Sequence, residues 1–158
     1  MSRVQLALRV SDLEGSIDFY TKLFGVAPAK LRPGYANFAV ERPPLKLVLI
    51  EGEADQPTVM DHLGVEVFSG DEVTAATSRL REAGLLTVPE ENTECCYALQ
   101  DKVWVHGPGQ EPWEVYVVKG DADRLAKHDD GGACRCGEPD TNAETVAGQL
   151  PVAATNCC

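Results

Sequence analysis

The sequence predicts an α+β fold in which two similar modules, each a strand and a helix followed by further strands, enclose a cleft. Two observations predict this class: strand-like and helix-like patterns alternate through the first 119 residues, and the second half of that stretch weakly repeats the first. Composition changes near Gly120, after which there is no aromatic residue and no sustained apolar period. We therefore expect a domain over residues 1–119, with modules at about 1–52 and 60–119, and a cysteine-containing C-terminal tail over residues 120–158, either mobile or laid over the domain.

The first module opens with "VQLALRV" (4–10), where apolar residues alternate with polar or small ones as in a β-strand. An amphipathic helix is predicted in "DLEGSIDFYTKLFG", with Gly25 as its stop and with an apolar face formed by Ile17, Tyr20, Leu23 and Phe24. The short strands "YANFAV" and "PLKLVLIE" close the module, and "GEADQPT" links it to the second.

The second module repeats this order. The strand "DHLGVEV" (61–67) aligns with the first strand so that His62 matches Gln5. The helix in "SGDEVTAATSRLREAG" ends at Gly84, and its apolar face is Val73, Ala76, Leu80 and Ala83. The strands "CCYALQ", "KVWVHG" and "WEVYVV" close the module.

The bulk composition excludes several functions. A net charge of −11 argues against binding to nucleic acid or to an anionic membrane, because both need a basic surface. No segment is typical of a signal peptide or is long enough to span a bilayer, so we expect a cytoplasmic protein. In the cytoplasm six cysteines favour thiols, ligands or redox groups over a disulfide framework, and the neighbours Cys95 and Cys96 would form only a strained disulfide.

Strand alternation predicts one metal site in the cleft. If the apolar residues of each strand pack under the helices, His62 and Glu114 face the cleft together, and Gln5 occupies the place that matches His62. An imidazole, a carboxylate and an amide oxygen suit Fe(II), Mn(II), Ni(II), Co(II) or Zn(II). The first half has Lys46 where the second has Glu114, so the repeat offers one site rather than two. Taken singly, each residue is more often an ordinary surface or hydrogen-bonded side chain.

The sequence resembles the vicinal oxygen chelate superfamily, which includes glyoxalase I, extradiol dioxygenases and antibiotic-sequestering proteins. "LRVSDLEGSIDFYTKLFGVAP", "DHLGVEV" and "EPWEVYVV" are similar to its strand–helix unit and its ligand-bearing strands. The block "ECCYALQDKVWV" most specifically resembles the arsenic- or cadmium-inducible branch, which includes C–As lyases; the resemblance spans about residues 3–119. It implies paired βαβββ modules forming the cleft of this superfamily, with Gln5, His62 and Glu114 as ligands of Fe²⁺, for which Ni or Co can substitute, and Cys95 with Cys96 as the arsenic-binding pair.

The thiol pair has a chemical rationale. A trivalent organoarsenical has two exchangeable positions beside its carbon, and two neighbouring thiolates can fill both because arsenic is soft. Successive strand residues point to opposite faces, so the pair requires a turn, and the preceding polar "PEENTE" suggests a mobile loop. The alternative is a core Cys96 beside an incidental Cys95. The tail cysteines Cys134, Cys136, Cys157 and Cys158 either relay arsenic or cadmium or are dispensable, and His106 and His128 are interpreted as surface residues.

The resemblance implies an O₂-dependent enzyme that degrades methylarsenite or aromatic arsenicals to inorganic arsenite. One alternative is a glyoxalase-like enzyme, although Lys46 stands where such enzymes usually have a fourth ligand. Another is a non-catalytic cadmium- or arsenic-sequestering stress protein, and an antibiotic-binding module fits poorly with an aromatic content of 6%. The halves either pair within one chain or swap between the chains of a homodimer.

Overall fold

The computed structural model describes residues 2–125. Most of the predicted tail therefore lies outside the described residues, including its four cysteines and His128. Within the described part, the last strand continues to Asp121, two residues past the domain boundary expected from composition.

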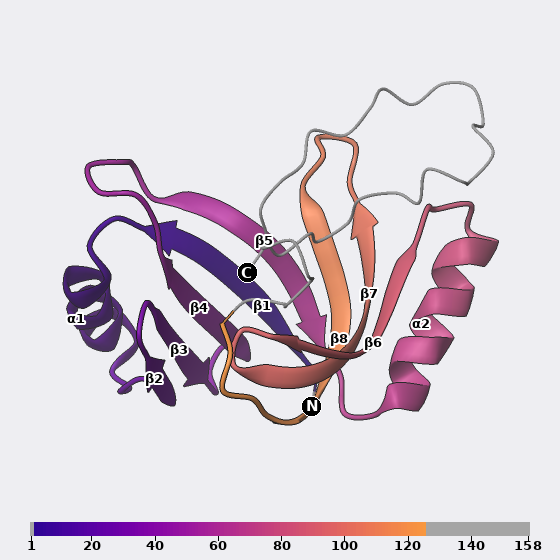
Figure 1. The fold of residues 1–158 in the computed structure, drawn as a ribbon, viewed down its shortest axis with the longest axis horizontal. Coiled ribbons are helices and arrows are strands. Elements are labelled where there is room, and N and C mark those ends of the chain that lie inside the picture. The colour runs from indigo at the N-terminus through magenta and orange to yellow at the C-terminus, as the bar shows by residue number, and fades with distance from the viewer. Residues whose placement is uncertain (1, 126–158) are drawn as a thin grey trace.

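Eight strands form one curved sheet with a helix on the outer side of each half (Figure 1). The first module consists of β1 (Arg3–Val10), α1 (Leu13–Phe24), β2 (Lys30–Arg32), β3 (Tyr35–Val40) and β4 (Leu45–Glu51). The second consists of β5 (Val59–Glu66), α2 (Gly70–Glu82), β6 (Val88–Cys95), β7 (Ala98–His106) and β8 (Pro112–Asp121). The strand order β2-β3-β4-β1-β5-β8-β7-β6 confirms the paired βαβββ architecture.

The two modules join edge to edge within one chain. β1 pairs antiparallel with β5, while β1 with β4 and β5 with β8 are parallel pairs inside each module. Because side chains alternate across a strand, one set packs under the helices and the other faces the concave side of the sheet. Under α1 the first set includes Val10, Phe38 and Leu49, and under α2 it includes Val103 and Val117.

Local signals in the sequence set the ends of both helices. The side chains of Asp12 and Ser69 cap the N-termini of α1 and α2 by accepting hydrogen bonds from backbone amides three residues later. Gly25 follows α1 with a left-handed backbone, as predicted. The predicted apolar faces are correct except for Leu23, which is 58% exposed, and Ala83, which is exposed just past the end of α2.

Two strands were not expected from the sequence, and they change the reading of the cysteine block. Lys30–Arg32 forms the short β2, and the polar "PEENTE" is part of β6 rather than a loop. "CCYALQ" and "KVWVHG" are not separate strands, because β7 runs unbroken from Ala98 to His106. Pairing with β7 satisfies the backbone of β6 although few of its side chains are apolar, which is why hydrophobic periodicity missed it.

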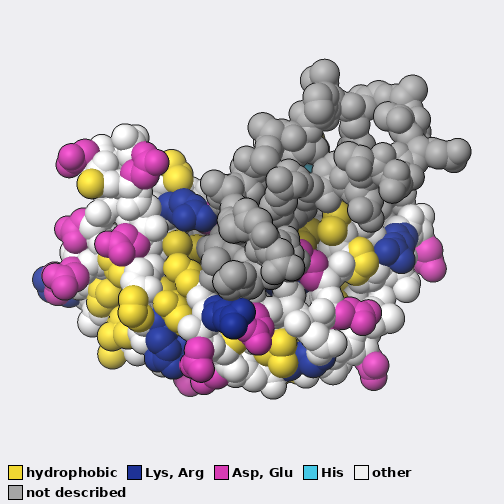
Figure 2. Space-filling view, in the orientation of Figure 1, with side chains coloured by type: hydrophobic (Ala, Val, Ile, Leu, Met, Phe, Trp, Pro, Cys, Tyr) yellow, Lys and Arg dark blue, Asp and Glu magenta, His cyan; other side chains and the backbone are white. Residues whose placement is uncertain are grey.

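On the face in Figure 2, Lys and Arg side chains are separated from one another over the described surface. On the face in Figure 2, Asp and Glu are scattered over the described surface, and hydrophobic side chains gather towards α1, where Phe19 and Leu23 are exposed. Within residues 2–125, neither helix has the length and hydropathy needed to cross a membrane.

Candidate metal and thiol site

Three polar side chains from the adjacent strands β1, β5 and β8 meet on the concave face. Gln5 Nε2 lies 2.9 Å from His62 Nε2 and 2.8 Å from Glu114 Oε1, and the last two atoms are 3.4 Å apart. All three side chains are buried. The register explains their meeting, because Gly64 of β5 pairs with Gln5 on one side and Glu114 on the other. The structure thus brings together the three residues that the sequence nominated as ligands.

Gly64 also makes room for these side chains. A Cβ atom at this position would lie 3.1 Å from Glu114 Cγ, 3.2 Å from Tyr116 Cε1 and 3.3 Å from Gln5 Cβ. These separations are tighter than ordinary van der Waals contact, so any side chain here would push the cluster apart.

His62 is oriented by its neighbour Asp61. His62 Nδ1 lies 2.7 Å from Asp61 Oδ2, and Asp61 is in turn paired with Arg9. Neighbours on a regular strand face opposite sides, but the register of β1 and β5 shifts here, so that Asp61 is skipped between His62 and Met60. Burial opposes a charged imidazole, yet the hydrogen bonds to Asp61 and Glu114 raise the pKa of His62 to about 10. In the neutral ring, a proton held at Nδ1 by Asp61 leaves the Nε2 lone pair facing Gln5 and Glu114.

Glu114 is held by a buried lysine. Lys102 Nζ, on β7, donates to Glu114 Oε2 at 2.8 Å, and both side chains are at most 3% exposed. Burial opposes ionisation of the carboxyl group, but the Lys102 charge, followed by the His62 hydrogen bond, lowers the pKa of Glu114 to about 2. The carboxylate is therefore ionised, with Oε2 occupied by Lys102 and Oε1 turned towards His62 and Gln5.

The donor set fits a small divalent cation. Two ligand atoms that bind an ion at right angles, each at about 2.1 Å, lie about 3 Å from each other. The separations of 2.8 to 3.4 Å between the three polar atoms bracket this value. Among residues 2–125, no three His, Cys, Asp or Glu side chains form a metal site, so an ion here depends on the Gln5 amide. Gln5 Oε1 now accepts from Tyr116 Oη at 2.6 Å, and a half-turn of the amide would point this oxygen at His62 and Glu114. Tyr116 Oη can then accept from Nε2 instead.

Lys46 offers no fourth ligand. It lies beside Gln5 in the register, and its Nζ is 3.5 Å from Glu66 Oε1 and 4.9 Å from the centre of the Tyr116 ring. Burial, outweighing the attraction of Glu66, lowers the pKa of Lys46. Because the repeat matches Gln5 with His62, a Glu114 that matched Lys46 would pair with His62. Glu114 pairs with Gly64, so the predicted match between Lys46 and Glu114 is not reproduced in the strand register of the two modules.

Cys95 and Cys96 lie at the tip of the β6–β7 hairpin with their sulfur atoms 3.3 Å apart. Cys96 and Tyr97 form a two-residue turn in which both have positive φ angles, 54° and 58°. This left-handed conformation overrides strand alternation and lets both thiols reach the same side, as bidentate capture requires. A hydrogen bond with Cys95, followed by burial, raises the pKa of Cys96, so the Cys96 sulfur is a thiol at neutral pH. Neither cysteine forms a disulfide within residues 2–125.

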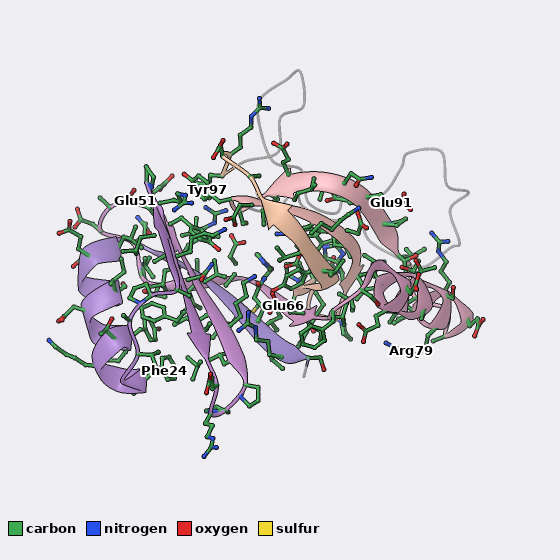
Figure 3. The ribbon with its side chains drawn as sticks, turned by 90° about the horizontal axis from the view of Figure 1, so that it is seen from below. Phe24, Glu51, Glu66, Arg79, Glu91 and Tyr97 are labelled. Carbon is green, nitrogen blue, oxygen red and sulfur yellow. The ribbon has the colours of Figure 1, made fainter. Side chains whose placement is uncertain are left out.

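Contacts from elsewhere in the chain hold this unfavourable turn. Backbone amides of Cys96 and Tyr97 each donate at 2.8 Å, to Leu125 O and Arg124 O respectively. Tyr97 Oη donates to Pro33 O at 3.0 Å, and Lys30 Nζ donates to Tyr97 O at 3.1 Å. The hairpin of the second module is thereby fastened to the first, and Figure 3 shows Tyr97 reaching over to its strands. The expected mobile loop is instead an anchored turn.

One pocket of about 160 Å³ connects the Cys96 thiol with the polar cluster. Cys96 lines it together with Gln5, His62 and Glu114. Ala98, Gln100 and Lys102 also line it, because alternate residues of β7 face the concave side. Glu66, which Figure 3 places between the halves, lines it as well.

Sequence reasoning missed the roles of several residues that line this pocket or contact the polar cluster. Alternation along β7 from the turn would have identified Gln100 and Lys102 had the hairpin been placed correctly. Tyr116 shares the cleft face with Glu114 and was recognisable in the same way. No sequence pattern identifies Asp61, because the shift in the β1–β5 register that turns it towards His62 depends on pairing between strands. His106 ends β7 partly exposed, away from the residues that line the pocket.

Comparisons with known proteins found a matching family model, similar sequences and similar folds. Residues 3–115 match the Glyoxalase/Bleomycin resistance protein/Dioxygenase superfamily. The chain is 69% identical over 134 residues to a trivalent organoarsenical cleaving enzyme of Thermomonospora curvata, covering 85% of this chain and 89% of that protein. It is 55% identical over 142 residues to the cadmium-induced protein CadI of Mycobacterium tuberculosis, covering 86% and 93%. An extradiol ring-cleaving dioxygenase from B. fuscum has a similar fold, with a TM-score of 0.55 and 21% identity over 78% of this chain and 34% of that one.

Proposed function

Because the chain belongs to the Glyoxalase/Bleomycin resistance protein/Dioxygenase superfamily, we propose that it cleaves the carbon–arsenic bond of trivalent organoarsenicals and yields inorganic arsenite. The observation that carries the proposal is that Cys96 shares one pocket with Gln5, His62 and Glu114, so that a thiol-bound arsenical would lie beside a metal-binding cluster. The 69% identity to an organoarsenical cleaving enzyme supports the same reaction.

The first task of the protein is capture. Each thiol exchanges with a hydroxyl on arsenic, forming an S–As bond and releasing one water, so that two thiols convert CH₃As(OH)₂ into a dithiolate with no change in oxidation state. The anchored turn holds Cys95 and Cys96 with sulfurs 3.3 Å apart before the substrate arrives. Because the pair is preformed, chelation loses little further conformational entropy. The carbon remains on the third position of arsenic.

We propose that His62, Glu114 and the Gln5 oxygen hold Fe(II). Nitrogen and oxygen donors of this kind suit Fe(II), and Ni or Co can replace it. When bound, the ion supplies a coordination site at which O₂ is activated. Asp61 fixes the His62 ring, Lys102 holds Glu114 Oε2, and the pocket walls orient the thiol-bound arsenical towards the cluster. A cytoplasmic location, a homodimer and the extent of the tail remain predictions.

The proposal is tested by anaerobic reconstitution with Fe(II), followed by addition of O₂ and methylarsenite or phenylarsenite, with arsenite quantified by chromatography. We expect O₂-dependent release of arsenite from the native protein. Cys95→Ser and Cys96→Ser should lose turnover but retain Fe(II), whereas His62→Ala should lose Fe(II) but retain the arsenical. Full turnover of methylarsenite by both serine variants would refute the role of the thiols.

A second candidate is sequestration of cadmium or arsenic without turnover, which the neighbouring thiols of Cys95 and Cys96 would also permit because both elements favour sulfur ligands. A relative that is 55% identical is named as cadmium-induced. In that case the protein would bind cadmium stoichiometrically and consume no O₂ with methylarsenite. Measuring O₂ uptake in the same reconstituted samples separates the two functions.

A further inference from the structure

Gln100 carries a buried acceptor that no contact within residues 2–125 satisfies. Its side chain is 4% exposed, it lines the pocket, and its Oε1 has no hydrogen-bond partner among the described residues. Buried acceptors are rarely left unpaired, because losing water without gaining a partner is unfavourable. We therefore expect a molecule bound in the pocket to donate a hydrogen bond to Gln100 Oε1.

The orientation of the Gln100 amide is fixed by its other end. Nε2 donates to the backbone carbonyl of Cys95 at 3.2 Å. A flipped amide would set two acceptor oxygens against each other, so Oε1 must point away from this carbonyl. Gln100 Nε2 thus holds the strand that bears Cys95, and Gln100 Oε1 is left unpaired in a side chain that lines the same pocket as Cys96.

The position of Gln100 along β7 suggests what it binds. It lies between Ala98, which follows the thiol turn, and Lys102, which reaches Glu114. All three side chains line the pocket, so an arsenic atom held by Cys95 and Cys96 would have Gln100 beside it. The available donors of a thiol-bound arsenical are the hydroxyl groups on arsenic.

We propose that Gln100 is a product-binding residue whose Oε1 accepts a hydrogen bond from the hydroxyl of arsenite held by Cys95 and Cys96. This inference rests on the proposed function. Capture of As(OH)₃ by two thiols releases two waters and leaves one As–OH group. Capture of CH₃As(OH)₂ by the same thiols also releases two waters but leaves only a methyl group, which donates nothing to Gln100.

The difference between these two arsenicals provides the test. In the full-length chain with Cys134, Cys136, Cys157 and Cys158 replaced by serine, binding is measured by equilibrium dialysis with arsenic quantified by mass spectrometry. Gln100→Met should weaken binding of arsenite by roughly fivefold and of methylarsenite by less than about twofold. The hydrogen bond from Nε2 to Cys95 O is lost with either ligand, whereas only the arsenite complex also loses a hydrogen bond to the ligand. Equal weakening, or no change for either ligand, would overturn the role of Gln100.

Two further variants keep the result interpretable. Thr93→Val removes a buried hydroxyl that, like Gln100 Oε1, has no hydrogen-bond partner in the described part of the chain. Thr93 pairs with Gln100 across the strands but does not line the pocket. Thr93→Val should leave the ratio of the two affinities unchanged, and a drop equal to that of Gln100→Met would overturn the proposal. If Gln100→Met does not fold, Gln100→Asn withdraws the acceptor while keeping an amide and should show the same selective loss.

Failure of this inference is distinguishable from failure of the proposed function. A double variant, Cys95→Ser with Cys96→Ser, should bind neither ligand in the serine-tail background. If it still binds methylarsenite, the thiol site itself is wrong. If the thiols bind and the native chain cleaves methylarsenite, yet Gln100→Met is not selective, only the role of Gln100 is refuted.

Discussion

Lys102 Nζ lies 2.8 Å from Glu114 Oε2 in the interior of the protein, where neither side chain is more than 3% exposed. Removal of one partner from such a pair leaves an uncompensated charge in a medium that solvates it poorly. Lys102 therefore stabilises the fold only when it forms an ion pair with Glu114.

Lys102→Met should destabilise the metal-free protein by about 3 kcal/mol, because Glu114 would remain buried and ionised without the lysine that contributes most to holding its charge. Urea unfolding followed by circular dichroism measures the loss. The matched control is Lys119→Met, which removes a partly exposed pair with Asp101 and should cost less than about 1 kcal/mol. Equal losses for the two variants would show that burial of the Lys102 pair has no special importance.

Asp61 should govern affinity for iron without touching the ion. In the proposed site it holds the Nδ1 proton of His62 and so keeps Nε2 available. Asp61→Leu should weaken Fe(II) binding by about 10- to 100-fold, and Asp61→Asn, which retains an acceptor oxygen, should weaken it less. Anaerobic competition with a chromophoric chelator gives both affinities. Unchanged affinity in Asp61→Leu would mean that His62 is positioned by other contacts.

Much of the fold could be predicted from the sequence because its signals are local. The alternation in residues 4–10 and 61–67 and the glycine after α1 each report on neighbouring residues. β6 could not be predicted in this way, since it is polar and exists through its pairing with β7. Misplacing β6 also misplaced the Cys95–Cys96 turn, which an anchored hairpin rather than a loop provides.

The site follows the same division. His62 and Glu114 could be nominated because alternation assigns each to a face of its strand, and Gln5 because the repeat matches it with His62. Their close contact depends on strand register, and neither Asp61 nor Lys102 has a motif that reveals its partner. The strained turn at Cys96 and Tyr97 is held by residues as distant in sequence as Pro33 and Leu125, so no local pattern could foretell it.

Cys96 should react slowly with alkylating reagents at neutral pH. Its pKa is raised, first by the hydrogen bond with Cys95 and then by burial, so the reactive thiolate forms only above the usual range. Iodoacetamide labelling, followed by peptide mass spectrometry across pH 6 to 11, should give a midpoint above that of free glutathione. Burial slows labelling at every pH, but the midpoint reports the pKa. Cys95→Ala should lower the midpoint, and a native midpoint below pH 8 would contradict the arrangement of the two thiols.

Gly64 should be indispensable to the polar cluster, because an added methyl group would press on Glu114, Tyr116 and Gln5 together at 3.1 to 3.3 Å. Relief requires those buried side chains to move, and overpacking of this kind costs about 1 to 3 kcal/mol. Gly64→Ala should therefore lower the stability of the metal-free chain by this amount and weaken Fe(II) binding at least tenfold, measured by urea unfolding and chelator competition. Gly120→Ala is the matched control, since a Cβ atom there meets nothing within 4 Å. If Gly64→Ala bound Fe(II) as tightly as Gly120→Ala, the three side chains would not need their present spacing, and the proposed metal site would have to lie elsewhere.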